Sequence, residues 1–517
     1  MWSAVLGIML VSLALECWAL QRDLPFSDVD EPTFVKPAVH IAATGDLNPH
    51  WFGHPGSTTI YPLAGLYRAW DTVVHGGPVF SSSPGLTHRF LTSPTEFYLI
   101  GRLWTVAFAV AAIPLIFLLG RRAFSTPVGL VAAALWAFVP LMVRYGREVR
   151  TDSAGVFFTV LALLLIMRLL ERPSVVRHAL AGAAIGLGIA SRYFLVTLVP
   201  VLIVAGLIAI RRRAAQTTAW GIAAGLGAAI GAFALTTPYF FLDWAAAHRS
   251  LGLENAPSVA HGGLSPPENL RWYLVSSIPN TISWPIALLA VGGIVLALAR
   301  KPDARRMLLI AAGVTLLIAI SASKLHWGRW PLPILPIAVL FAAYALIAVA
   351  SAVQARTRGS VFAPAAIAGV AMLSVMPAKA VVELNQLDSR PSTRVAAREW
   401  IQAHVPSGST VARELKTAPL EGTGLLVRFR SPLPEHGWTL DRYRRDGFEY
   451  LMTGAGISGP YTTHPRSYPM EADFYRELRH QACLLHEFRP NADRGGPTIR
   501  VYQLPPAVGD CRPRATA

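Results

Sequence analysis

The sequence predicts a mainly α-helical, polytopic membrane protein with about 11 transmembrane helices and a small α/β domain at its C-terminal end. Of its 517 residues, 53% are hydrophobic and only 15% are charged, and the mean hydropathy is +0.43. In a typical soluble domain about a quarter of the residues are charged. The chain contains three cysteines, which excludes a disulfide scaffold and a cysteine-rich metal protein.

The membrane prediction depends on apolar runs close to the ~20 residues that a helix needs to cross ~30 Å of hydrocarbon. We expect these helices at 2–20, 97–120, 127–143, 153–170, 179–191, 194–210, 217–237, 283–299, 307–322, 331–350 and 361–378. The first run lacks a basic leader and a small-residue cleavage site, so we expect a retained helix rather than a cleaved signal peptide.

The basic residues orient these helices. A net charge of +16 would suggest nucleic acid binding in a soluble protein, but here the cations occupy short loops between apolar runs. The loops are Arg121–Arg122, Arg172–Arg177, Arg211–Arg213, Arg300–Arg306 and Arg356–Arg358. The positive-inside rule assigns them to the cytoplasm. The long connections 22–96 and 238–282, and the residues after 380, are then outside, and nucleic acid is not expected as a partner.

The composition changes near residue 380, so we expect a transmembrane module at 1–379 and an extracytoplasmic α/β domain at 380–517. Residues 392–403 have the period of an amphipathic helix, and "GLLVRF", "FEYLM" and "TIRVYQL" alternate as strands do. Cys483 and Cys511 both lie in this domain. They are either a disulfide, which persists outside the cytoplasm, or two buried apolar side chains.

The first outer loop, 22–96, begins with three carboxylates in "DVDEP": Asp28, Asp30 and Glu31. Pro32 suits the first turn of a helix, and residues 33–43 are expected to form an interfacial helix whose apolar side chains face lipid. The acidic residues can cap that helix, and a carboxylate at the membrane edge can also act as a base. These two interpretations are compatible.

Histidines follow in the same loop. We considered a metal site among His40, Asp46, His50 and His54, but their spacing matches no recognised zinc motif, so no metal ligand is predicted. Interfacial histidines packed among aromatic residues are the simpler interpretation. His54 and Tyr61 are expected, with Asp28, to belong to a loop that contacts substrate.

Cations gather at the same expected depth on the outer side. In "RYGREVRTDSAG", Arg147 and Arg150 run against the positive-inside trend, and Asp152 can cap the next helix. The other cations are Lys36, Arg192, Lys324 and Arg329. Tryptophan and lysine at an interface are often only anchors. Their convergence instead favours an anionic ligand such as a lipid phosphate, for which arginine is well shaped.

These motifs carry a family resemblance. The acidic "DE" pair, "GDLNPHWFGHPGSTTIY" and "YGREVRTDSAG" resemble the family 39-type glycosyltransferases. These are GT-C membrane enzymes related to protein O-mannosyltransferases and to the aminoarabinose transferase of lipid A. The segments "HWGRWPLPILP" and "DSRPSTRVAAREWIQAHVPSGSTVARE" look like those of bacterial members, so the resemblance covers nearly the whole chain.

The resemblance implies a glycosyltransferase of the bacterial inner membrane that takes its sugar from a polyprenyl phosphate on the outer face. The acceptor is a glycan, a lipid or a protein. Asp30 matches the presumed catalytic base, with Glu31 as its neighbour, and Asp152 matches the acidic residue of the second outer loop. Arg192 stands where many members have lysine. No cofactor is implied with certainty, and a divalent metal has no support in the sequence.

The chemistry is reasonable without the resemblance. Fixed cations stabilise a leaving phosphate, and one carboxylate base with attack from the opposite face inverts the anomeric centre. Two alternatives remain open. One is a polymerase or ligase that uses longer lipid-linked glycans. The other is a transporter or flippase, although such proteins usually place ionisable residues near the bilayer midplane.

Overall fold

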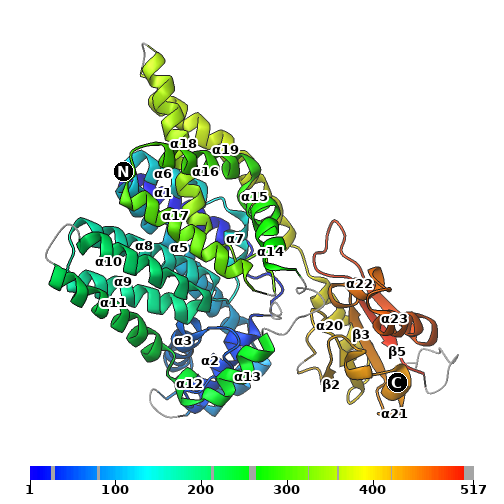
Figure 1. Cartoon of the computed structure of the whole chain (residues 1–517). Coiled ribbons are helices and arrows are strands. Elements are labelled where there is room, and N and C mark those ends of the chain that lie inside the picture. Colours follow the sequence, from blue (N-terminus) through cyan, green and yellow to red (C-terminus); the bar gives the residue numbers. More distant parts are fainter. Residues whose placement is uncertain are drawn as a thin grey trace. The chain divides into compact units, whose positions relative to one another are not determined.

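The computed structural model describes residues 1–24, 30–78, 82–210, 215–254, 264–323, 325–357, 360–420 and 422–505. The chain divides into two compact units, which are described separately (Figure 1). The helical unit comprises Met1–Leu20, Thr33–Ser83 and Ile100–Asn385. The sheet unit comprises Gln21–Pro32, Pro84–Leu99 and Gln386–Ala517.

The longer helices begin and end close to the predicted apolar runs. They are α1 (Trp2–Cys17), α2 (Pro32–Thr44), α3 (Ser57–His75), α5 (Thr95–Ala123), α6 (Thr126–Trp136), α7 (Pro140–Gly146), α8 (Asp152–Glu171), α9 (Val175–Ser191), α10 (Leu198–Ile210), α11 (Ala215–Thr236), α16 (Trp284–Ala299), α17 (Ala304–Ser321), α18 (Leu335–Arg356) and α19 (Phe362–Asp388). Short helices between α11 and α16 are α12 (Pro238–Leu242), α13 (Trp244–Glu254), α14 (Pro266–Trp272) and α15 (Ile278–Ile282).

Among the described residues, six helices are long and apolar enough to cross a membrane alone. Two bent pairs pass the same test together: α6 with α7, bent by 63°, and Pro266–Ile282 with α16, bent by 117°. Three shorter apolar helices are α1, α9 and Tyr193–Ala209. Each predicted run therefore lies on an apolar helix, which confirms the mainly α, polytopic fold class.

The predicted third run, 127–143, is broken rather than continuous. Pro140 is the first residue of α7 and lacks the N–H that a continuing helix would need, so α6 ends at Trp136. The break leaves the short α7 and the loop after it, residues 147–151, to approach the start of α8. That loop is the centre of the segment "RYGREVRTDSAG" and contains Arg147 and Arg150.

Glycines set the closest helix contacts of the helical unit. Helix α9 packs against both α8 and α11, and α16 packs against α18. A Cβ added at Gly182 would lie 1.9 Å from the carbonyl oxygen of Gly225, and one added at Gly293 would lie 2.0 Å from that of Phe341. Only glycine fits at these positions, as is common where apolar helices associate without a hydrophobic driving force.

Helix α8 is buried along most of its length and separates two polar ends. At its C-terminal end, Glu171 lies 3.8 Å from Arg122 and 3.6 Å from Arg305, both of which belong to the basic loops. At its N-terminal end is Asp152. A 20-residue helix rises about 30 Å, so the basic loops and Asp152 lie about one hydrocarbon thickness apart.

Helix α2 forms where the interfacial helix was expected, but its predicted contact with lipid is wrong. Phe34, Val35, Ala38 and Ile41 are all 5% exposed or less, because they pack within the protein. An apolar stripe shows that one face of a helix is buried, but it does not show what covers that face.

The sheet unit has the predicted α/β character. Its five strands, in the order β2-β1-β3-β5-β4, are β1 (Thr410–Arg413), β2 (Leu426–Phe429), β3 (Tyr450–Gly454), β4 (Cys483–Phe488) and β5 (Ile499–Gln503). Strand β1 is parallel to β2 and β3, and β5 is antiparallel to β3 and β4. The three predicted strands coincide with β2, β3 and β5.

Helices cover both faces of this sheet. The predicted helix at 392–403 is α20 (Thr393–His404), and its Ala397 and Ile401 pack with Val411 of β1. The opposite face packs against α21 (Leu440–Arg445), α22 (Ala455–Thr463) and α23 (Pro469–Gln481). Cys483 of β4 is disulfide-bonded, and Cys17 of α1 is free, whereas Cys511 lies outside the described residues.

A buried carboxyl group, Glu414, follows β1 at the centre of the sheet unit. It accepts hydrogen bonds from the N–H groups of Gly454 (2.9 Å) and Leu433 (3.3 Å) and from the hydroxyl of Tyr475. Burial raises the pKa of Glu414 to about 7, although these donors oppose the shift. The folded chain therefore holds this proton more tightly than the unfolded chain, whose value is near 4.5.

We predict that the Glu414 proton makes the sheet unit pH-sensitive. The stability it provides is fully present below about pH 4.5 and is lost as the pH rises through 7. Relative to the wild type, Glu414→Gln should become more stable by up to about 3 kcal/mol between pH 5 and pH 8. Thermal unfolding of the full chain in detergent, with hydrogen exchange of β1 and β3, measures this. The exposed Glu399→Gln is the control. A difference in stability between Glu414→Gln and the wild type that stays the same from pH 5 to pH 8 would contradict the assignment.

Candidate functional site

The centre of the candidate site is a buried ion pair between α8 and α9. Asp152 is the first residue of α8, and Arg192 directly follows the last residue of α9. A guanidinium nitrogen of Arg192 donates to Asp152 Oδ1, and the two residues are 9% and 3% exposed. A Cβ added at Gly155 would lie 3.1 Å from Cγ of Arg192, so this glycine leaves room for the arginine to lie along α8.

The geometry corrects the capping role expected of Asp152. Thr151 is the N-cap of α8, and the carboxylate of Asp152 lies in the first turn, where the helix dipole still favours negative charge. One oxygen of Asp152 is held by Arg192. The other, Oδ2, receives no hydrogen bond from any described residue.

Two further arginines surround this pair. Arg329 and Arg150 both interact electrostatically with Asp152. Arg329 is 6% exposed and stacks on Trp327, with its guanidinium carbon 4.3 Å from the ring centroid. Arg150 lies 3.1 Å from Glu148, which the sequence analysis did not single out. We call Asp152, Arg192, Arg329, Arg150 and Glu148 the Asp152 cluster.

His54 lies beside the Asp152 cluster, in the loop between α2 and α3. Burial, followed by the nearby Arg192 and Arg329, lowers the pKa of His54 to about 4, against the opposite effect of Asp152. The imidazole is therefore neutral at pH 7. It can donate or accept a hydrogen bond there without adding a charge.

Hydrogen bonds hold this loop against the end of α9. The hydroxyl of Tyr193 donates to the carbonyl oxygen of Phe52 at 2.9 Å. The hydroxyl oxygens of Thr58 and Ser191 lie 2.8 Å apart. Because Ser191 and Tyr193 flank Arg192, the same short segment positions both the arginine and the loop that carries His54.

The Asp152 cluster concentrates buried charge at one end of α8. It contains three guanidinium groups and two carboxylates, all on residues less than 10% exposed. Buried charges are costly unless they meet opposite charges or hydrogen-bond partners. Arginine binds phosphate and carboxylate oxygens through a planar fork of N–H donors. The arrangement is suited to an anionic group.

Arg147 has other contacts. It donates to Asn385 of α19 and interacts electrostatically with Glu16 of α1, and Asn385 in turn donates to the carbonyl oxygen of Leu15 at 3.0 Å. A Cβ added at Gly146 would lie 2.1 Å from Glu16 Oε2, so the packing is tight. Glu16 had been interpreted from the sequence as incidental, although a lone carboxylate in an apolar run is itself a signal of a partner.

The structure describes some of the remaining predicted residues, and two of them lie outside the described part of the chain. Lys36 is exposed on α2. Tyr61 of α3 donates to the carbonyl oxygen of Leu47 at 3.0 Å, and burial raises its pKa to about 12. Asp30 and the buried Glu31 precede α2 and belong to the sheet unit. Asp28 and Lys324 lie outside the described residues.

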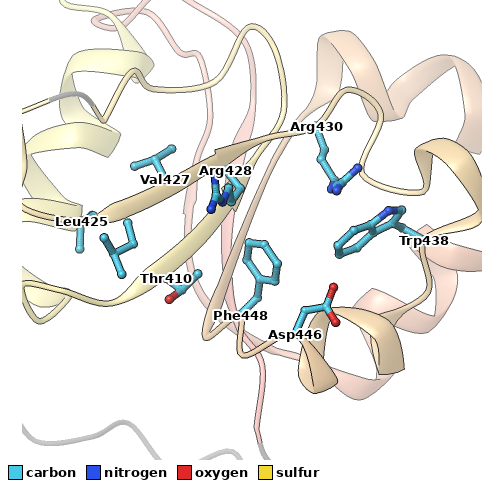
Figure 2. A pocket seen from close by; sticks show the side chains of 9 residues that line it. Thr410, Leu425, Val427, Arg428, Arg430, Trp438, Asp446 and Phe448 are labelled. Carbon is cyan, nitrogen blue, oxygen red and sulfur yellow. The ribbon is translucent and has the colours of Figure 1, made fainter.

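The sheet unit has a concave site of its own, a cavity of about 700 Å³ beside the edge strand β2. Figure 2 shows Arg430, Trp438, Asp446 and Phe448 around it. The guanidinium carbon of Arg430 lies 3.5 Å from the centroid of the Trp438 ring. Arg428 of β2 also lines the cavity. Its walls thus combine aromatic, cationic and acidic groups.

Comparisons with known proteins find one family model and several solved structures that match this chain. Residues 98–238 match the family model described as dolichyl-phosphate-mannose-protein mannosyltransferase, a range that includes Arg150, Asp152 and Arg192. No curated protein matches the chain.

Solved structures match nearly the whole chain. ArnT from Cupriavidus metallidurans in the apo state is 13% identical, with a TM-score of 0.58 over 96% of this chain and 97% of that one. The same protein bound to undecaprenyl phosphate is 14% identical, with a TM-score of 0.52 over 96% of each chain. An Archaeoglobus fulgidus oligosaccharyltransferase tethered to an acceptor peptide is 12% identical, with a TM-score of 0.52 over 93% and 72%.

These matches confirm the expected resemblance: the chain has the fold of the GT-C membrane glycosyltransferases. Within that class it is similar along its whole length to ArnT, and through residues 98–238 to the protein mannosyltransferases.

We predict that the Asp152–Arg192 pair is strongly coupled. Asp152→Asn or Arg192→Gln alone leaves a buried charge uncompensated and should cost about 3–5 kcal/mol, whereas the double variant should cost less than the sum. Unfolding of the detergent-solubilised chain measures the cycle. The exposed pair Asp473–Arg476 (2.8 Å) is the control and should couple by less than about 1 kcal/mol. Equal coupling in the two pairs would contradict the prediction.

Proposed function

We propose that this protein is a membrane glycosyltransferase that transfers a sugar from a polyprenyl-phosphate donor to an acceptor hydroxyl on the outer face of the membrane. The observation that carries the proposal is the Asp152 cluster, with its three buried guanidinium groups at the end of α8 opposite the basic loops. In this proposal the basic loops are cytoplasmic, and the cluster lies at the outer surface of a bacterial inner membrane.

The donor phosphate is the anion that the cluster is proposed to bind. A polyprenyl phosphate places its charge at headgroup depth while its chain remains in lipid, which agrees with a buried cationic site at a helix end. The structural match to ArnT bound to undecaprenyl phosphate supports this class of ligand. Arg329 and Arg192 are the proposed phosphate contacts, and the neutral His54 can donate a hydrogen bond to the same group.

In the proposed reaction the acceptor oxygen attacks the anomeric carbon as the bond between that carbon and the phosphate oxygen breaks. The pair of electrons leaves with the phosphate, and the arginines stabilise the charge that develops there. The acceptor proton passes to a carboxylate. Asp30 is the proposed base, with Glu31 beside it in the chain, and the single displacement inverts the anomeric centre.

The cavity of the sheet unit is a candidate contact for the acceptor. Arg428, Asp446 and the aromatic ring of Trp438 supply the hydrogen bonds and the flat apolar surface by which proteins hold polar, ring-shaped ligands. This contact would select the acceptor without taking part in the chemistry.

We predict that Asp30→Asn abolishes transfer while expression and membrane insertion stay normal, because an amide cannot accept the acceptor proton. The purified chain is incubated with a panel of polyprenyl-phosphate sugars and candidate acceptors, and release of polyprenyl phosphate is measured. The exposed Asp493→Asn is the matched control. Full activity in Asp30→Asn would exclude this base, and failure of the wild type to bind or consume any donor would count against the enzyme itself.

For the acceptor cavity, Arg428→Ala should raise the KM for the acceptor about tenfold at saturating donor, because a charge-assisted hydrogen bond is lost. The KM for the donor should not change. The assay uses whichever peptide, glycan or lipid the transfer experiment shows to be glycosylated. Arg445→Ala, an exposed arginine that does not line the cavity, is the control. Equal KM values in all three proteins would remove the cavity from the acceptor site.

A further inference from the structure

A second group of ligand-type side chains gathers where α2 ends. His40 lies on the last turns of α2, and Asp46 and His50 lie in the loop that follows. The Nε2 atom of His50 is 3.1 Å from Asp46 Oδ2, and the Nε2 atom of His40 is 3.7 Å from the same oxygen. One ligand atom from each of the three residues lies within 4.8 Å of the other two.

These distances suit one metal ion. A zinc ion bound at about 2.0–2.1 Å in a tetrahedral arrangement holds its ligand atoms about 3.4 Å apart. The two histidine-to-aspartate distances fall on either side of that value. Small rotations of exposed side chains are enough to bring all three atoms onto one ion.

The loop backbone holds two of the three ligands in place. Asp46 Oδ1 accepts from the N–H of Asn48 at 2.9 Å, which leaves Oδ2 directed at the histidines. His50 has a φ of +56°, in the left-handed region that a residue other than glycine seldom adopts, and its N–H donates to Asn48 Oδ1 at 2.9 Å. The side chain of Asn48 also donates to Asp243 at 2.9 Å. Such outer contacts typically orient the ligands of a metal.

We propose that His40, Asp46 and His50 bind a divalent transition-metal ion of the zinc type. Two imidazoles and one carboxylate favour zinc and its first-row neighbours over magnesium or calcium, which prefer oxygen ligands alone. All three residues are exposed, so at least one coordination position faces solvent and can hold water or an oxygen of a ligand. The ion would tie the end of α2 to the loop that continues to His54.

A search of the sequence for zinc motifs does not find this site. The spacing of ten residues between His40 and His50 matches no short motif, and the three ligands meet because α2 ends at Thr44 and the chain reverses. His54, the fourth residue considered from the sequence, lies instead beside Arg192 and Arg329.

Direct binding tests the site without any substrate. The full chain, purified with its affinity tag removed and treated with chelator, is titrated with Co²⁺ and followed by visible absorption, then with Zn²⁺ in competition. We expect one Co²⁺ per chain, displaced by Zn²⁺ and unaffected by Mg²⁺. His40→Ala and His50→Ala should each weaken binding at least tenfold. The exposed His88→Ala, on α4 (Pro84–Thr92), should bind as the wild type does.

Two results would overturn the proposal. The first is a wild-type chain that binds no stoichiometric Co²⁺ or Zn²⁺. The second is an equal loss in His88→Ala, which would indicate scattered surface binding. Equal melting temperatures of the metal-free variants and the wild type show that weaker metal binding comes from the lost side chains and not from a damaged fold. Because binding is measured without a donor, its failure would leave the transferase proposal untouched, and loss of transfer alone would leave this site untouched.

Discussion

The ion pair between Asp152 and Arg192 is the interaction on which the site geometry depends. Two opposite charges buried at the ends of adjacent helices must stay together, because separating them leaves a bare charge in an apolar bundle. The pair therefore fixes the start of α8 against the end of α9, and Gly155 provides the space for it. Since Ser191 and Tyr193 flank the arginine and also bond to residues 52 and 58, the loop that carries His54 is fixed by the same constraint.

Sequence reasoning predicted the helices well because their signal is local. A long apolar run specifies a buried or lipid-facing helix whatever surrounds it, and Pro140 alone accounts for the one broken run. Helix α2 was predicted, but its apolar face was wrongly assigned to lipid, because lipid and protein interiors select the same apolar residues. The partner of Arg147 was missed for a related reason. Glu16 is distant in sequence, and only the packing of α1 beside α7 brings the two charges together.

The same contrast applies to the site. Topology placed Arg150, Asp152, Arg192 and Arg329 at one depth, and the structure brings these four into electrostatic contact. Topology could not show that Asp152 is bound by Arg192, or that Glu148 neutralises part of the charge, because those contacts depend on side-chain directions. Nor could it show the charge state of His54, which follows from burial and from two arginines contributed by other parts of the chain.

The state of His54 bears on how such a site can release its product. A further fixed cation would bind the released phosphate, which carries more negative charge than the donor, more strongly still and would slow its departure. A neutral imidazole beside Arg192 and Arg329 adds a hydrogen bond while leaving the net charge unchanged. The negative charge of Asp152 offsets part of the positive charge of Arg192. The proposed phosphate therefore meets a site that is cationic but already partly neutralised. Such a site can stabilise the leaving group and still let the spent lipid phosphate depart.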